Sequence, residues 1–202
     1  MKRWIAIAAV ALLAVGCATV DGMMGWTTLI DGEKGLENFN RLGDANWRAE
    51  GGAIVADKAK ESSSLLVTKN SYKDLQIHAE FWADTTTNSG IFIRITNPQK
   101  VGADSSYEVN IYDLRPGQEY GTGGIVNFAK VPLPNPHKAA GKWNTYDITA
   151  KGSTITVVFN GVKTVDVKDG KLKSGVIGLQ HAKGVKDDLK PIKFRKVEIR
   201  AL

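Results

Sequence analysis

Residues 88–94 read NSGIFIR and residues 107–113 read YEVNIYD, with a turn-rich segment between the two stretches. Apolar and polar side chains alternate in both, which is typical of β-strands that bury one face. The polar positions carry asparagine, arginine and glutamate instead of the threonine, lysine and serine of a plain solvated face. The two stretches therefore predict neighbouring strands with a binding face opposite the core.

Alternation assigns the side chains of each predicted strand to one face or the other. The first strand directs its isoleucines at positions 91, 93 and 95 to the core, which places Arg94 on the opposite face. In the second strand, Glu108 and Asn110 lie opposite Val109. We therefore expect Arg94 and Glu108 to meet across neighbouring strands.

Short alternating runs bounded by Gly, Asn, Asp and Pro recur along the whole chain, and helical periodicity is nearly absent. Asn160-Gly161 supplies the positive φ angles of a two-residue hairpin turn, and Gly51-Gly52 predicts a second tight turn. So many strands in one medium-sized domain predict an all-β fold of two packed antiparallel sheets. The expected strands are 26–30, 47–50, 53–56, 64–68, 75–83, 90–96, 106–112, 124–128, 144–150, 154–160, 163–167, 176–180 and 192–200.

The N-terminus has the pattern of a secretory signal. A basic start, Met1 to Arg3, precedes an apolar run over residues 4–16 that is too short to span a bilayer as a helix. Cys17, the single cysteine, follows small residues as in a bacterial lipoprotein cleavage site; the alternative is that it ends an ordinary signal peptide. We expect a signal peptide over 1–16, a lipidated Cys17 with a tether over 17–25, and one domain over 26–202.

These assignments predict where the protein is located and which macromolecules it meets. Export with a lipid on Cys17 implies a periplasm-facing lipoprotein, and Ala18 after the cysteine favours the outer membrane by similarity to other lipoproteins. The formal net charge is +6, but the basic residues are spread among acidic ones, without an aromatic-interleaved basic patch. We expect contact with a membrane through the anchor only, and no nucleic-acid partner.

Several common hydrolytic arrangements are not found in the sequence. Glu108 and Asp113 are five residues apart, so a regular strand sends them to opposite faces, whereas a retaining glycosidase needs two carboxylates about 5–5.5 Å apart. The chain has no Gly-x-Ser-x-Gly turn. Its three histidines do not show a metal-ligand spacing.

From about residue 25 to the end, the chain resembles the 3-keto-disaccharide hydrolase domain family. Seven short motifs occur in the family's order, and together they are specific although each is weak alone. The resemblance implies a concanavalin A-like jelly roll of the lectin/glucanase type and activity on 3-keto-glycosides. Asn110 departs from the family, which usually has glutamine at that position. The motifs are residues 25–32, 88–94, 107–113, 143–144, 160–161, 175–181 and 194–199.

The reaction implied by this resemblance needs one base instead of a carboxylate pair. A ketone at C3 acidifies the proton at C2, so a base can remove that proton while the group at C1 leaves, and water can then add. His181 and Glu108 are the two candidates for the base, and the sequence does not choose between them. Each candidate also has a purely structural interpretation. His181 can be a hydrogen-bonded histidine at the end of its strand, and Glu108 can form an ion pair with Arg94.

Five further residues are predicted to bind a small saccharide. Arg94 has a planar, permanently charged group that suits an enolate or a pair of hydroxyls. Gln180 shares a face with Gly178, where the missing side chain leaves room for a sugar ring. We expect Arg94, Glu108, Asn110 and Gln180 to line one cleft on the concave face. The complete set of predicted substrate-binding residues is Arg94, Asn110, Gln180, Asn88 and Asp113.

The sequence also allows functions of other classes. A carbohydrate-binding, lectin-like lipoprotein without turnover would need only a polar cleft, and a structural envelope lipoprotein would need no cleft at all. We expect no obligatory cofactor, and a divalent cation held by Glu108 stays open. A carboxyl group or an imidazole with a perturbed pKa in a cleft would favour an enzyme over these two alternatives.

Overall fold

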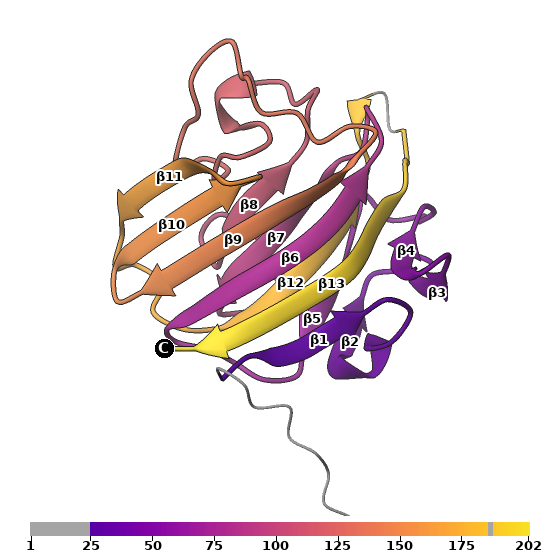
Figure 1. Cartoon of the computed structure of the whole chain (residues 1–202), viewed down its shortest axis with the longest axis horizontal. Coiled ribbons are helices and arrows are strands. Elements are labelled where there is room, and N and C mark those ends of the chain that lie inside the picture. The colour runs from indigo at the N-terminus through magenta and orange to yellow at the C-terminus, as the bar shows by residue number, and fades with distance from the viewer. Residues whose placement is uncertain (1–24, 186–187) are drawn as a thin grey trace, which may run out of the picture.

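The computed structural model describes residues 25–185 and 188–202, which form two antiparallel β-sheets packed face to face (Figure 1). Every strand pairing between named strands is antiparallel, and a shared apolar core lies between the layers. The predicted all-β sandwich is therefore confirmed. The predictions for the signal peptide and Cys17 concern residues outside the described part of the chain.

The larger sheet has the order β11-β10-β9-β6-β13-β4-β3, and β1 pairs with the remaining part of β13. In Figure 1 this layer lies in front, with β6 and the C-terminal β13 at its centre. Its strands are β1 (Thr27–Asp31), β3 (Arg48–Glu50), β4 (Ala53–Ala56), β6 (Leu75–Ala83), β9 (Trp143–Lys151), β10 (Thr154–Phe159), β11 (Val162–Lys168) and β13 (Ile192–Ala201).

The smaller sheet has the order β2-β5-β12-β7-β8 and carries the site described below. Strands that are adjacent in this sheet come from distant parts of the chain, since β12 lies between β5 and β7. Its strands are β2 (Phe39–Leu42), β5 (Ser63–Thr68), β7 (Ser89–Ile95), β8 (Tyr107–Ile111) and β12 (Val176–Ala182).

Alternation along the strands places the main core between the two sheets. In β6 the residues at odd positions from 75 to 83 are buried and the intervening ones are half-buried, as expected for a strand with one face on the core. Ile91 and Ile93 of β7 join this core together with Leu179 of β12. Burial of this apolar area is the main favourable term in folding.

Two predicted turns are confirmed by the backbone. Asn160 and Gly161 have φ angles of 47° and 81° and join β10 to β11, as a type I′ turn requires. Gly51 and Gly52 also have positive φ angles and join β3 to β4. The expected strand at 124–128 is replaced by isolated bridges of Ile125, and β2 had no clear alternating signal.

Helices are few in the part of the chain that the structure describes. The described residues contain two short 3-10 helices, η1 (Leu36–Asn38) and η2 (Gln118–Tyr120). Within residues 25–185 and 188–202, no helix has the length and apolarity needed to cross a membrane.

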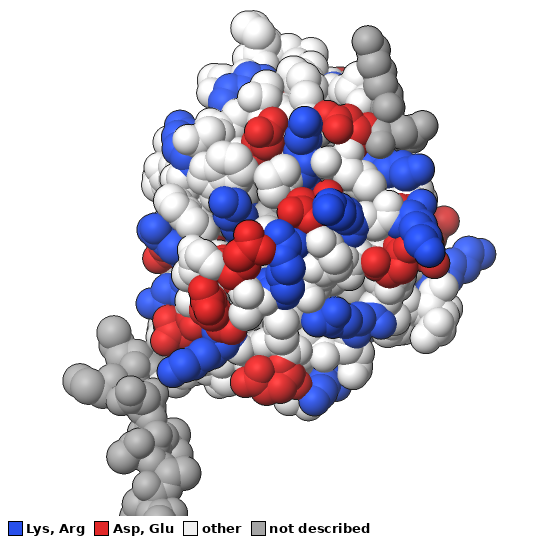
Figure 2. Space-filling view, turned by 90° about the vertical axis from the view of Figure 1, so that its right-hand side faces the viewer, with Lys and Arg blue, Asp and Glu red and all other residues white. Residues whose placement is uncertain are grey.

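Acidic and basic side chains are mixed on the face of the molecule shown in Figure 2. Some pair along a strand: Lys196 Nζ lies 3.2 Å from a carboxylate oxygen of Glu198 on β13. Charges distributed in this way largely cancel at distances beyond the Debye length. The positive net charge of the chain is therefore not gathered into a patch on this face.

Candidate functional site

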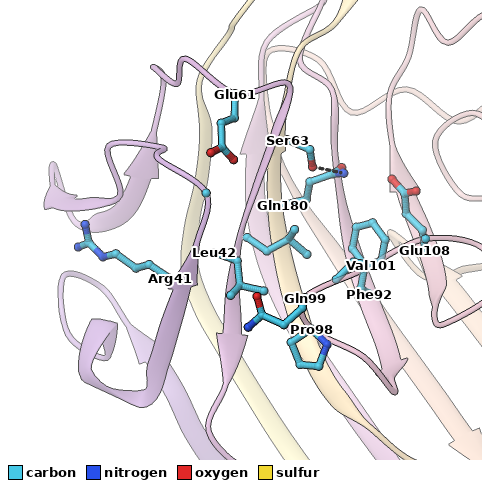
Figure 3. A pocket seen from close by; sticks show the side chains of 13 residues that line it. Arg41, Leu42, Glu61, Ser63, Phe92, Pro98, Gln99, Val101, Glu108 and Gln180 are labelled. Carbon is cyan, nitrogen blue, oxygen red and sulfur yellow. Dashed lines mark hydrogen bonds between the residues drawn. The ribbon is translucent and has the colours of Figure 1, made fainter.

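A cleft of about 500 Å³ lies on the outer face of the smaller sheet (Figure 3). Its floor includes Leu65 of β5, Gln180 of β12 and Phe92 of β7. Two loops form its walls, one containing Glu61 before β5 and one containing residues 98–102 between β7 and β8. The volume is within the range of clefts that bind small molecules, about 300–1,000 Å³.

The floor is a small apolar layer, separate from the main core. Leu65, Val67, Phe92 and Ile95 are buried against one another on this outer side, and Val101 packs on them from the loop. A Cβ atom on Gly178 would lie 2.8 Å from side-chain atoms of both Leu65 and Ile95, so only glycine leaves the floor undisturbed. The prediction that Gly178 leaves room for a sugar ring was therefore wrong, because the side chains of Leu65 and Ile95 fill that space.

Glu108 on β8 is the titratable group of this cleft whose environment is most unusual. Removal from water raises the pKa of its carboxyl group to about 7, and the positive charge of Arg115 opposes the shift only in part. Gly90 on β7, which pairs with Asn110 two residues further along β8, gives the side chain its space, because a Cβ there would lie 2.9 Å from Glu108 Cγ. The carboxyl group therefore keeps its proton to a higher pH than an ordinary glutamate does.

Gln180 presents an unused acceptor at the centre of the floor. Its Nε2 donates to Ser63 Oγ at 3.1 Å, drawn as the dashed line in Figure 3. Its Oε1 is buried and has no partner among the described residues, and only 8% of the residue is exposed. A buried carbonyl without a donor costs about 1–3 kcal/mol, and a ligand hydroxyl would remove that cost.

Arg94 does not line the cleft, so that part of the predicted site was wrong. β7 has a bulge at this point: two residues, Ile93 and Arg94, lie opposite the single Ile177 between the pairs Phe92–Gly178 and Ile95–Val176. Arg94 itself adopts a φ of 53°. Beyond Arg94 the alternation of faces is shifted by one residue. Ile95 was predicted to face the main core, but it faces the apolar layer under the cleft.

The side chain of Arg94 instead ties loops together at one end of the sandwich. It is fully buried and donates to the carbonyl oxygens of Leu172 at 2.9 Å and Gly152 at 2.8 Å, and also to that of Lys73. Its carboxylate partner is Asp74, at 3.4 Å, and not Glu108. Arg94 is thus a structural residue, and Glu108 forms no ion pair with any residue that the structure describes.

Asn110 and Asp113 lie under a loop and not in the cleft. Asn110 is fully buried and its Nδ2 donates to the carbonyl oxygen of Tyr120 at 2.6 Å. The carboxylate of Asp113 accepts hydrogen bonds from the hydroxyl of Thr122 and the backbone amides at positions 139 and 140. Both residues hold the long loop that follows β8, so neither reaches a ligand in the cleft.

The side chain of Asn88 is also engaged in a hydrogen bond to the backbone. Its Nδ2 donates to the carbonyl oxygen of Lys183 at 2.6 Å, and its backbone bridges to Ala182. This bond fastens the segment before β7 to the end of β12. Of the predicted binding residues other than Glu108, only Gln180 lies in the cleft.

His181 lies on the inner side of the smaller sheet, away from the cleft. It is fully buried and meets Trp47 of the main core edge to face, with ring centroids 6.5 Å apart. Burial lowers the pKa of its imidazole, which favours the neutral form. A general base must come within about 3 Å of the proton it removes, so the structure leaves Glu108 as the candidate of the two.

The residues of the walls carry no pattern in the sequence that marks them as site residues. Glu61, Ser63, Gln99 and Arg41 line the cleft but belong to loops or strand ends without an alternating pattern. Arg41 contributes its stem, because its guanidinium donates to the backbone carbonyl oxygen of Trp47. Only the folded chain brings these positions together, so no local signal identifies them.

Metal binding receives no support from the arrangement of ligands. In the described part of the chain, no group of three or more His, Cys, Asp or Glu side chains could hold a metal ion.

The two-sheet sandwich agrees with comparisons to known proteins. The model of the 3-keto-alpha-glucoside-1,2-lyase-like domain matches residues 25–200. The chain therefore belongs to this family, and the resemblance inferred from its motifs is confirmed. No curated protein matches the chain.

Two solved structures from Parabacteroides distasonis, both described as candidate glycosyl hydrolases, are similar over most of their length. One is 25% identical with a TM-score of 0.70, covering 88% of this chain and 99% of the other. The second is 27% identical with a TM-score of 0.64, covering 89% of this chain and 84% of the other. The family and these structures make the chain a carbohydrate-active protein.

A more distant structure shows the fold alone. The carbohydrate-binding module CBM66 from Bacillus subtilis is 15% identical with a TM-score of 0.56 and covers 89% of this chain and 98% of the module. The concanavalin A-like, lectin-type architecture predicted for the chain is therefore confirmed.

Proposed function

We propose that the protein cleaves 3-keto-glycosides, with Glu108 as the base that removes the C2 proton. The observation that carries this proposal is the carboxyl group itself, half-buried at the edge of a sugar-sized cleft with a pKa of about 7. A base whose pKa lies near the working pH is half available and still strong enough to take a proton. An ordinary solvated glutamate would be a much weaker base.

The chemistry needs no second carboxylate. Glu108 takes the proton from C2, the electrons of that bond form a C1=C2 double bond, and the C1–O bond breaks with its electron pair. The departing oxygen takes a proton from water. Addition of water across the double bond then gives the free 3-keto sugar. Elimination of this kind fits a cleft in which Glu108 lies apart from the other carboxyl group, that of Glu61.

Gln180 supports the same function by binding the sugar. Its buried Oε1 accepts a hydroxyl hydrogen, and the hydroxyl of Ser63, which accepts from Gln180, retains its own hydrogen for donation. A hydroxyl pair on one sugar ring presents both a donor and an acceptor. The floor is thereby complementary to a sugar face, with Phe92 providing apolar contact beneath it.

Isotope incorporation tests the mechanism. Turnover of a 3-keto-glycoside in deuterated water is expected to place deuterium at C2 of the product, because the proton lost to Glu108 exchanges with solvent. The control is the product incubated without enzyme for the same time, since ketones exchange slowly unaided. Product without deuterium at C2 would mean direct displacement at C1.

A carbohydrate-binding protein without turnover is the second candidate. The apolar floor and the unsatisfied Gln180 are sufficient for binding, and the fold is shared with a carbohydrate-binding module. The two functions differ at Glu108: binding alone does not need a carboxyl group with a raised pKa. If the wild-type protein binds 3-keto-glycosides and leaves them intact, this second function is the right one.

We further propose that the protein is exported and anchored by a lipid on Cys17, at the outer membrane. The support is the sequence: a basic start, a short apolar run and a single cysteine after small residues. Metabolic labelling with a fatty acid is expected to mark the wild-type protein and not Cys17→Ser. Label on the Cys17→Ser protein would contradict lipidation at this residue.

A further inference from the structure

We propose that the reacting sugar ring carries an acetamido group at C2, and that a small second cavity beside Glu108 receives this group. The inference rests on the proposed function and narrows its substrate to 3-keto-glycosides of 2-acetamido sugars. It assigns the second cavity to substrate specificity, while removal of the C2 proton stays with Glu108.

The second cavity has a volume of about 80 Å³ and borders the main cleft. Phe92, Gly102 and Glu108 line both spaces, so Glu108 lies where the two spaces meet. The other lining residues belong to the segment before β8 and to the long loop that follows it. These residues are Ala103, Ser106, Val126 and Asn127. A ligand in the main cleft can therefore extend past Glu108 into the second cavity.

The position of Glu108 decides which part of the sugar lies at the second cavity. A base must come within about 3 Å of the proton it removes, so C2 lies next to the carboxyl group of Glu108 during the reaction. The proton and the other substituent of C2 are bonded to the same carbon atom, so that substituent also lies beside Glu108. The substituent of C2 is therefore the part of the ring that reaches the second cavity.

The size of the cavity fits an acetamido group better than a hydroxyl group. Two waters, which have roughly the volume of an acetamido group, occupy about 60 Å³ in the liquid. A hydroxyl group would leave most of the 80 Å³ to water. Phe92 and Val126 provide apolar contact for the methyl group. The cavity is therefore large enough for the whole group and apolar on part of its wall.

Polar atoms of the lining complement the amide of an acetamido group. Ser106 Oγ donates its hydrogen to the carbonyl oxygen of Gly102 at 2.8 Å, so its lone pairs are available to accept from the N–H of the ligand. Asn127 lines the same cavity, and its side-chain amide can donate to the carbonyl oxygen of the ligand. The lining thus offers one acceptor and one donor, as an amide requires.

Hydrogen bonds hold both walls of the second cavity in place without a ligand. On one side, the carbonyl oxygen of Gly102 also accepts from the backbone amide of Ser105 at 3.0 Å. On the other side, the backbone amide of Val126 donates to the carbonyl oxygen of Glu108 at 3.0 Å, which fixes this part of the long loop beside β8. The cavity is therefore preformed, and a ligand does not need to order its walls.

Two substitutions with a matched control test the cavity. Ala103→Leu places a larger side chain on the wall at an exposed position. Asn127→Gly removes the side-chain amide at a residue with a φ of 58°, which glycine adopts without strain. Ala49→Leu makes the same change as Ala103→Leu on an exposed residue of β3 that lines neither space. Each protein is assayed with two methyl 3-keto-glycosides that differ only at C2, one with an acetamido group and one with a hydroxyl group.

The wild type is expected to have a kcat/KM at least tenfold higher for the acetamido substrate, because a cavity that fits a substituent discriminates by about 10–200-fold against a substrate without it. Ala103→Leu is expected to lower kcat/KM for the acetamido substrate about tenfold and to leave the hydroxyl substrate within twofold. Asn127→Gly is expected to cost about fivefold on the acetamido substrate alone, as for one lost hydrogen bond. Ala49→Leu is expected to match the wild type on both substrates.

The opposite results would overturn the inference. A wild type that prefers the hydroxyl substrate has no use for the cavity in recognising an acetamido group. Equal changes on both substrates in Ala103→Leu, including no change on either, would mean that the cavity holds only water. An Asn127→Gly protein without a selective loss would remove Asn127 from recognition.

Binding measurements separate this inference from the proposed reaction. If the wild-type protein cleaves neither substrate, the reaction is wrong, and calorimetric titration with the two corresponding methyl glycosides that have a hydroxyl group at C3 decides the role of the cavity. Tighter binding of the acetamido glycoside that Ala103→Leu weakens supports the cavity as its site. Equal affinities, or no measurable binding of either glycoside, overturn it.

Discussion

Glu108 lies on β8 and Asp113 lies just after this strand. The carboxyl groups of both residues are withdrawn from water, but their surroundings differ. Asp113 accepts hydrogen bonds from the hydroxyl of Thr122 at 2.6 Å and from the amides of Ala139 and Ala140 at 2.9 and 3.0 Å. Glu108 has no such donor, and burial raises its pKa. One carboxyl group is fully satisfied and the other is not.

The difference shows how to distinguish structural from reactive carboxyl groups in one region. Hydrogen bonds to a carboxylate stabilise its charged form and fix its position, so Asp113 holds the loop that follows β8. A carboxyl group that is desolvated without donors is destabilised in its charged form, and a proton from a ligand relieves that strain. Burial alone does not distinguish a structural carboxyl group from a reactive one. The hydrogen-bond donors around the group distinguish them.

Replacement of Glu108 by glutamine is expected to have the largest effect. The variant keeps the shape of the side chain and loses the base, so kcat for a 3-keto-glycoside is expected to fall about 10²–10⁴-fold. Steady-state assays of sugar release measure it, with His181→Gln as a comparison for the other candidate base. Activity of Glu108→Gln within a few-fold of the wild type would remove Glu108 from the reaction.

Asp113→Ala is expected to act on stability and not on chemistry. It leaves two backbone amides and one hydroxyl without their acceptor, which is expected to lower the free energy of unfolding by about 3 kcal/mol. Urea denaturation measures the loss, and Asp166→Ala, an exposed residue of an ion pair with Lys163, provides the control. A loss below about 1 kcal/mol would show that the loop does not depend on these bonds.

Glu108→Gln is expected to change stability in the opposite direction from Asp113→Ala. The pKa of Glu108 is about 7 in the folded state against 4.5 as its ordinary value, so the wild type loses stability as pH rises from about 4.5 through 7. The glutamine variant does not. At pH 8 its unfolding free energy is expected to exceed that of the wild type by about 3 kcal/mol, and near pH 4 the two are expected to agree.

Denaturation at both pH values measures this difference, and Glu37→Gln serves as the control for the same substitution on the surface. A constant gap between the two proteins from pH 4 to pH 8 would mean that the carboxyl group titrates normally. The contrast between Glu108 and Asp113 would then have no electrostatic basis.

Gly90→Ala is expected to give the smallest effect. The added Cβ would lie 2.9 Å from Glu108 Cγ and 3.0 Å from its Oε1, so the carboxyl group must move. A misplaced base is expected to cost about tenfold in kcat/KM. Gly170→Ala, where a Cβ meets no atom within 4 Å, provides the control. If both variants behave as the wild type, the position of Glu108 is not critical.

Much of the fold could be predicted because its signals are local. Asn160-Gly161 fixes a hairpin by its backbone angles, and the alternation over 75–83 identifies the central strand β6 with its bounds. Glu108 and Gln180 were also found by alternation, since each lies on the polar side of a regular strand. Wherever a strand is regular, alternation alone identifies the face on which each side chain lies.

The remainder depends on features that leave no local pattern. The bulge at Arg94 adds one residue to β7, and alternation cannot show where an extra residue falls. His181 has the polar side chain of a site residue but the position of a core residue, one place from Gln180 on β12. Glu61 and Gln99 reach the cleft only through loops, whose path depends on tertiary packing.

The floor of the cleft and its walls come from different kinds of structure, and this division affects how the protein can change over evolutionary time. Floor residues such as Phe92 and Gly178 belong to paired strands, where substitution disturbs the packed layer. Glu61 and Gln99 lie outside the strands. Selection can therefore alter which ligand the cleft accepts by exchanging loop residues, while the packed floor and the folded sandwich are kept.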